Sequence, residues 1–219
     1  MREESLKSEI FSHLFRIISK SITQTHLKLK KKIVTMLKRS MVFIDAGNLL
    51  HGWSELCSRR EKRLIDYKKF IVVLADHTDF IRGYYYDSTT KEQQSPKQRY
   101  YDMLRQHTIT IVTKPLKFKR IVCRHCNHAE SNVPHQKGVD VAMATDMMGL
   151  CFEDAYDVAI VVSGDNDFEE AIKYIKSRGK NVWIVSCVSC LGQDLMRVGD
   201  RVIKIDDIYD RIAKPTKNI

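Results

Sequence analysis

The stretch VAIVVSGDNDF at residues 158–168 joins five consecutive apolar residues to a short acidic turn. Five apolar residues in a row are typical of a strand that is buried on both faces. Apolar residues at helical spacing follow over residues 168–178. A buried strand that leads through a polar turn into a helix is the unit from which a parallel sheet with helical layers is built.

The same succession recurs along the chain. The run MVFI at residues 41–44 ends in Asp45 and continues into AGN, which predicts a buried strand followed by a turn. The other predicted strands are residues 80–86, 108–112, 182–185 and 202–205, and the other predicted helices are residues 67–75, 96–106, 139–151 and 191–198. We therefore expect an α/β fold, a three-layer α/β/α sandwich with a mostly parallel central sheet.

The 219 residues suffice for one domain with a full hydrophobic core. We place it at residues 41–210, between a basic N-terminal extension at residues 1–40 and a short tail at residues 211–219. The extension holds ten Lys and Arg against three Glu, and therefore most of the net charge of +10. Its helical spacing leaves open an amphipathic helix that binds RNA or an anionic membrane, a helix docked on the domain, and a solvated extension. Met41 is an alternative start of the chain.

Cysteine usage and hydropathy indicate the compartment. No signal peptide is visible, and no apolar stretch is long enough to cross a bilayer. We therefore expect a cytoplasmic, reducing location, where the six cysteines are thiols or metal ligands before they are disulfides.

Residues 114–137 form the one long stretch in which we expect no regular structure, and its Cys and His residues are open to two interpretations, a local zinc site or unliganded loop residues. Its candidate ligands are Cys123, Cys126, His128 and His135. The weaker alternative is a four-cysteine site that adds Cys187 and Cys190. The two pairs are much farther apart in the sequence than those of a compact zinc finger.

Four aspartates stand where a parallel sheet exposes ligand-binding groups. Asp45 ends the first strand, and Asp165 and Asp167 follow the strand at residues 158–162. Asp140 begins a predicted helix. Ligands of open α/β sheets bind beyond the carboxyl ends of the strands, so we expect these carboxylates to converge. Each of them alone is also consistent with a helix N-cap or a turn.

The chemistry of clustered carboxylates favours a divalent cation. Carboxylates that lie close together repel one another unless they are protonated or bridged by a cation. Mg²⁺ and Mn²⁺ prefer oxygen ligands and often add a phosphate oxygen to their shell. Because such an ion activates a bound water and stabilises charge on a cleaved phosphodiester, the cluster predicts a metal-dependent hydrolase.

Three blocks of the sequence resemble the signature blocks of the NYN domain, a family of PIN-like nucleases. These blocks are VFIDAGN at residues 42–48, KGVDVAMATD at residues 137–146 and VSGDNDF at residues 162–168. The resemblance covers about residues 41–207. It implies a PIN-like, Rossmann-like fold, a pocket that binds Mg²⁺ or Mn²⁺, and RNA as the substrate class.

The resemblance also implies roles for individual residues. The catalytic and metal-binding positions that it carries over are Asp45, Asp140, Asp165 and Asp167. Asn48 and Ser163 match polar positions beside them, and Asp146 matches the second aspartate of the helix block. We expect Asn48, Ser163 and Lys137 to bind substrate. The extension at residues 1–40 and the stretch with Cys and His lie outside the minimal domain.

The main functional hypothesis is an endoribonuclease that acts on single-stranded RNA. A non-catalytic RNA-binding regulator with the same fold is one alternative. An aspartate-dependent phosphatase or phosphotransferase is the other, and self-association into a homo-oligomer stays open. Tyr84, Tyr85 and Tyr86 lie in a predicted strand, where core packing and base stacking are both open roles.

Overall fold

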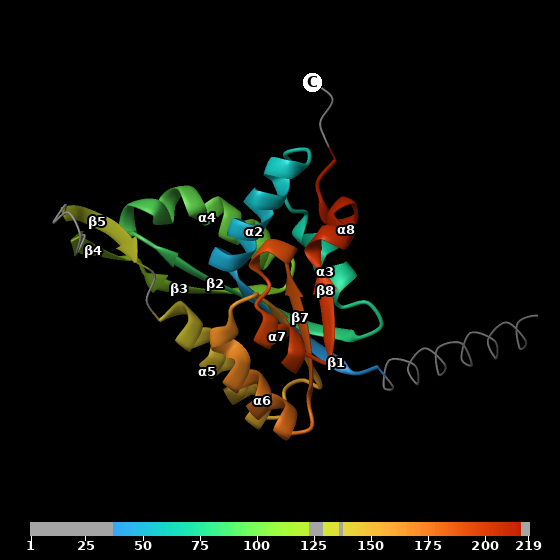
Figure 1. Ribbon diagram of the computed structural model, residues 1–219. Coiled ribbons are helices and arrows are strands. Elements are labelled where there is room, and N and C mark those ends of the chain that lie inside the picture. The colour runs from blue at the N-terminus through green and yellow to red at the C-terminus, as the bar shows by residue number, and fades with distance from the viewer. Residues whose placement is uncertain (1–36, 123–128, 136–137, 216–219) are drawn as a thin grey trace, which may run out of the picture. The chain divides into compact units, whose positions relative to one another are not determined.

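The computed structural model describes residues 37–122, 129–135 and 138–215 (Figure 1). Its main element is a six-stranded, fully parallel sheet in the order β3-β2-β1-β6-β7-β8. The strands are β1 (Arg39–Asp45), β2 (Asp79–Thr89), β3 (Ile109–Pro115), β6 (Val158–Val162), β7 (Asn181–Ser186) and β8 (Arg201–Lys204). Each predicted strand is present, with boundaries shifted by up to three residues.

Helices cover both faces of this sheet. The helices on one face are α2 (Ala46–Arg59), α3 (Tyr67–Leu74), α4 (Lys91–Arg105) and α8 (Ile205–Ile212). Those on the other face are α5 (Val139–Phe152), α6 (Glu169–Ser177) and α7 (Gln193–Val198). The side chains of β1 alternate between the two cores, since Val42 and Ile44 pack into the first and Met41 and Phe43 into the second. The three-layer α/β/α prediction is therefore confirmed.

Three local expectations were wrong. Residues 114–137 are not irregular throughout, because β4 (Lys117–Val122) and β5 (Ala129–His135) pair in an antiparallel two-stranded sheet. No turn separates β1 from a helix, because α2 begins at once with Asp45 as its N-cap. The strand expected at residues 202–205 ends at Lys204, and α8 follows it with Ile205, Ile208, Tyr209 and Ile212 on its buried side. Short strands and helices of one or two turns carry too weak a periodic signal for single-sequence reading.

The consecutive tyrosines of β2 belong mainly to the core. Tyr85 and Tyr86 are fully buried on opposite faces of the sheet. Tyr84 is partly buried and stacks on Phe43, with ring centroids 5.5 Å apart. Core packing, rather than base stacking, is therefore the role that this structure gives them.

The order of the strands reverses between β1 and β6. From β1 the chain proceeds outward to β2 and β3 with α2, α3 and α4 on one face, and from β6 it proceeds to β7 and β8 with α6 and α7 on the other. The connections that follow β1 and β6 therefore pass to opposite faces of the sheet at its carboxyl edge. Such a switch point is where open α/β sheets bind ligands.

Candidate metal centre

Asp45 and Ser163 stand side by side at the switch point. Ile44 of β1 pairs with Val162 of β6, so the next residue of each strand leaves the sheet at the same level. The Ser163 hydroxyl donates a hydrogen bond of 3.1 Å to Oδ2 of Asp45. The end of β1 is thereby fixed to the end of β6.

The carboxylate of Asp45 is buried, and only 5% of the residue is exposed. Its Oδ1 accepts a hydrogen bond of 3.1 Å from the Asn48 backbone N–H, which caps α2. Burial raises the pKa of Asp45 above its usual value, and repulsion from Asp140 raises it further, against the lowering effect of the bonds from Asn48 and Ser163. A cation beside Asp45 would stabilise its charged form.

Asn48 and Ser163 hold the loop that follows β6. Asn48 Oδ1 accepts a hydrogen bond of 3.0 Å from the Gly164 N–H, and Ser163 Oγ accepts one of 3.2 Å from the Asp165 N–H. At Gly164 a Cβ would lie 2.0 Å from the carbonyl oxygen of Cys190, so no larger residue fits there without backbone movement. Both polar side chains thus position the aspartates, and direct contact of either with substrate stays a prediction.

The remaining three carboxylates come from the turn after β6 and from the first turn of α5. Asp165 is partly buried, and its Oδ1 accepts a hydrogen bond of 3.0 Å from the Asp167 N–H in the 3-10 turn η1 (Asn166–Phe168). Asp140 occupies the first turn of α5. Partial burial raises the pKa of Asp140, and repulsion from Asp165 and from Asp167 adds to the rise. The structure therefore places Asp140 close enough to Asp45, Asp165 and Asp167 to interact with each of them, and the binding of one ion by these aspartates stays a prediction.

The donor set of this cluster suits a hard divalent cation. It consists of carboxylate oxygens, with the hydroxyl of Ser163 beside them. Asp140 repels Asp45, Asp165 and Asp167, and a cation placed among these carboxylates would reduce that repulsion. The residues present therefore fit Mg²⁺ or Mn²⁺, with several coordination positions left for water and phosphate oxygens.

Several predicted site residues cannot be placed. Lys137, Cys123, Cys126 and His128 lie outside the described residues. The backbone of His135 ends β5, but its side chain is likewise outside the description. The local zinc site accordingly stays a prediction.

Two further aspartates, Asp146 and Asp87, accept hydrogen bonds from neighbouring side chains. The Tyr86 hydroxyl donates a hydrogen bond of 3.0 Å to Asp146 Oδ2. Asp87 of β2, which the sequence reading missed, is 7% exposed and accepts bonds of 2.9 Å from both Lys97 Nζ and the Tyr101 hydroxyl. Asp87 follows an apolar strand as Asp45 does, so the same signal could have found it. Its charge is already balanced by Lys97, which separates it from the four repelling carboxylates.

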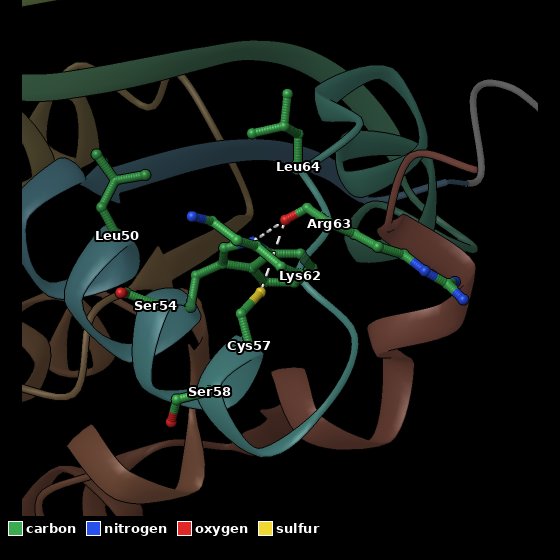
Figure 2. Close-up of a pocket in the computed structure, with 8 residues that line it drawn as sticks. Leu50, Ser54, Cys57, Ser58, Lys62, Arg63 and Leu64 are labelled. Carbon is green, nitrogen blue, oxygen red and sulfur yellow. Dashed lines mark hydrogen bonds between the residues drawn. The ribbon is translucent and has the colours of Figure 1, made fainter. Parts of the chain in front are cut away.

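A pocket of about 560 Å³ opens between α2 and the segment after it (Figure 2). Figure 2 shows the Arg63 carbonyl oxygen at its centre, where it accepts hydrogen bonds from Trp53 Nε1 at 2.9 Å and Cys57 Sγ at 3.6 Å. Its lining residues are Leu50, Trp53, Ser54, Cys57, Ser58, Lys62, Arg63 and Leu64. No carboxylate is among them, so this pocket offers no carboxylate ligand to a hard divalent cation.

Comparison with known proteins decides the family. The family model of the NYN domain matches residues 39–206, which include all four aspartates. The chain belongs to the NYN domain family. NYN domains have the PIN-like, nuclease-type fold, and the family is associated with nuclease activity, RNA binding and divalent metals.

Relatives of this NYN domain come from distant organisms. The low amplitude and bright protein LabA of Synechococcus elongatus is 24% identical over 181 residues, which cover 80% of this chain and 88% of LabA. An uncharacterized protein of Methanocaldococcus jannaschii is 34% identical over 84 residues, 36% of this chain and 35% of that protein. The crystal structure of a protein of unknown function from Vibrio parahaemolyticus superposes with a TM-score of 0.58 and 19% identity, over 81% of this chain and 97% of that one. The last comparison supports the fold alone.

Among the helices in the described part of the chain, none is both long enough and apolar enough to cross a bilayer.

Proposed function

We propose that this NYN domain is a metal-dependent endoribonuclease that hydrolyses phosphodiester bonds of single-stranded RNA. The observation that carries the proposal is the position of Asp45 and Asp165 at and just after the ends of the neighbouring strands β1 and β6, where Ser163 bonds to both and Asp140 is close enough to interact with each. Carboxylates held in such positions are costly without a cation, so their joint presence favours a metal site over four independent helix caps. RNA as substrate rests on the family.

In the proposed mechanism Asp45, Asp140 and Asp165 hold the ion, which is Mg²⁺ or Mn²⁺. When bound, such an ion lowers the pKa of a coordinated water and stabilises charge on the phosphate. Asp167 is exposed at the rim of the cluster and serves as an additional ligand or as the base that orients the attacking water. Ser163 and Asn48 hold the start of α2 against the segment that follows β6, through their hydrogen bonds to Asp45 and Gly164.

The geometry disfavours an aspartate-nucleophile phosphatase. Attack on phosphorus requires a free carboxylate oxygen aligned with the phosphate. Both oxygens of Asp45 accept hydrogen bonds, one from the Asn48 N–H and one from Ser163 Oγ, and the residue is buried. We therefore assign Asp45 no nucleophilic role. A non-catalytic RNA-binding role becomes an outcome of the experiment that follows.

The proposal is tested by incubating the purified protein with end-labelled single-stranded RNA and Mn²⁺ or Mg²⁺. We expect internal cleavage that EDTA abolishes and that Asp165→Asn reduces by about 100-fold or more, at or beyond the upper end of the loss typical of residues that only support metal ligands. Asp207→Asn, an exposed aspartate of α8 away from the cluster, is the matched control and retains activity. RNA binding without cleavage would favour the regulatory role, and cleavage that resists EDTA would refute the proposal.

A further inference from the structure

A second group of metal-binding side chains lies outside the aspartate cluster. It comprises His51 and Glu55 of α2 and Cys190 of the 3-10 turn η2 (Val188–Cys190). One ligand atom of each side chain lies within 4.8 Å of those of the other two. His51 and Glu55 are exposed and Cys190 is partly buried, so the group is accessible from solvent.

The fold itself brings these three side chains together. His51 and Glu55 are four residues apart on α2 and therefore share one face of the helix. Gly52 lies on the side of α2 against which η2 packs. A Cβ at Gly52 would lie 2.8 Å from Cys187 Cβ and 3.0 Å from Cys190 Sγ, so the absence of a side chain at this position permits the close approach of η2.

We propose that His51, Glu55 and Cys190 form a second metal site that takes Zn²⁺ or a similar borderline transition-metal ion. Imidazole nitrogen, carboxylate oxygen and thiolate sulfur are the three ligand types that Zn²⁺ uses in proteins, whereas Mg²⁺ and Mn²⁺ prefer oxygen alone. The donor chemistry therefore separates this site from the aspartate cluster. Three protein ligands leave the fourth position of a tetrahedral ion for water.

The present spacing requires only a small closure. Zn–N and Zn–S bonds of about 2.0 and 2.3 Å place the ligand atoms of a tetrahedral ion about 3.5 Å apart. The three atoms are within 4.8 Å of one another without an ion, so side-chain rotation on the solvent side of α2 is enough to close the site. Cys187 does not belong to the group, because its side chain is buried against Gly52.

The proposed site is coupled to the loop that carries Asp165. The carbonyl oxygen of Cys190 occupies the space where a side chain at Gly164 would stand, and the Gly192 N–H donates a hydrogen bond of 2.8 Å to the Gly164 carbonyl oxygen. An ion that joins Cys190 to α2 would therefore restrict the movement of the segment that packs against Gly164. The inference goes beyond the proposed function and does not depend on RNA cleavage.

The test uses Co²⁺ as a spectroscopic probe of the zinc site in the full chain. Cys123→Ser/Cys126→Ser serves as the background, because it removes the thiols of the other predicted zinc site. In this background we expect bound Co²⁺ to give a thiolate-to-Co²⁺ charge-transfer band, which disappears when Zn²⁺ displaces the Co²⁺. Co²⁺ bound by the aspartates has no thiolate ligand and gives no such band.

Three further variants in that background assign the band to individual residues. We expect Cys190→Ser to abolish it and His51→Ala, a change at an exposed position, to weaken Co²⁺ binding by at least about tenfold. Cys57→Ser, which removes another thiol of α2, leaves the band unchanged. No band in the background protein, or a band that survives Cys190→Ser or is unaffected by His51→Ala, would overturn the proposal.

Discussion

The hydroxyl of Ser163 donates a hydrogen bond of 3.1 Å to Oδ2 of Asp45, from the end of β6 to the end of β1. These two strands flank the point at which the order of the sheet reverses. The same hydroxyl accepts a hydrogen bond from the Asp165 N–H, so one atom links two of the proposed metal ligands. The geometry of the metal centre therefore depends on a residue that need not contact the metal.

Ser163→Ala tests this dependence. The substitution leaves Oδ2 of the buried Asp45 without its donor, which we expect to cost about 1–2 kcal/mol in the free energy of unfolding. RNA cleavage should fall about 10- to 100-fold, the loss typical of groups that support metal ligands, and more Mn²⁺ should be needed for half-maximal rate. Urea unfolding and a Mn²⁺ titration of cleavage measure the two effects. Ser177→Ala, on the exposed end of α6, should change neither, and unaltered Mn²⁺ dependence in Ser163→Ala would argue against the role of Ser163.

The repulsion within the cluster predicts a particular pH dependence of stability. The pKa of Asp45 and that of Asp140 are raised in the folded protein, so their contribution to stability is present below the unfolded-state pKa and is lost as pH rises through the folded-state pKa. Without metal, Asp140→Asn should therefore gain stability relative to the native chain as pH rises from 4 to 7. Because Asp140 is exposed to solvent, we expect a gain below about 1 kcal/mol.

Thermal unfolding in EDTA at a series of pH values measures this difference. Added Mn²⁺ should reverse its sign, since the ion stabilises the charged cluster and Asp140→Asn removes a ligand. A constant difference between the two proteins from pH 4 to pH 7 would contradict the repulsion on which the metal centre rests.

The opposite edge of the sheet predicts the opposite pH dependence. The Arg39 guanidinium donates two hydrogen bonds to the Asp157 carboxylate, from Nε to Oδ2 at 3.0 Å and from Nη2 to Oδ1 at 2.9 Å. These bonds hold the pKa of Asp157 well below its usual value. Stability from Asp157 is therefore present above the unfolded-state pKa of about 3.9 and is lost as pH falls through the folded-state pKa. We expect Asp157→Asn to cost about 1 kcal/mol at pH 7, after allowance for solvent screening, and the cost to disappear towards pH 2.

The matched comparison is the free energy of unfolding in urea of Asp157→Asn and of Asp207→Asn, each measured at pH 7 and at pH 2. Asp207 is exposed on α8, and we expect little effect from its replacement at either pH. An Asp157→Asn cost that persists unchanged in acid would mean that the ion pair does not contribute as described.

Gly164 and Gly149 form a matched pair for the close packing of the β6 loop. A Cβ at Gly164 meets the Cys190 carbonyl oxygen at 2.0 Å, whereas a Cβ at Gly149 of α5 meets nothing within 4 Å. Gly164→Ala should destabilise the fold by at least about 1–3 kcal/mol through overpacking. Gly149→Ala should stabilise it by about 0.5–1 kcal/mol, because alanine loses less backbone entropy in a helix. Equal effects in chemical denaturation would contradict the packing.

The sequence was most informative where its signal was long or repeated. Five apolar residues before Ser163 and four before Asp45 predicted two central strands, and the aspartates after them predicted the shared edge. The hairpin of β4 and β5 was missed because β4 mixes charged with apolar residues and β5 is mostly polar, so neither has the apolar run of the central strands. The three-way meeting of His51, Glu55 and Cys190 depends on how η2 packs against Gly52, which no sequence spacing specifies.

The rate of RNA cleavage by Asp140→Asn tests the central claim most directly. Asp140 lies on α5, a different element from those that carry Asp45 and Asp165, yet it must share the metal with both if these carboxylates form one centre. With saturating Mn²⁺ and excess enzyme, we predict that a single-turnover cleavage rate falls by about 100-fold or more in Asp140→Asn, at or beyond the upper end of the effect of supporting residues, while Asp207→Asn keeps the native rate. If the folded Asp140→Asn protein cleaves RNA as fast as the native chain, the four aspartates do not form one metal centre.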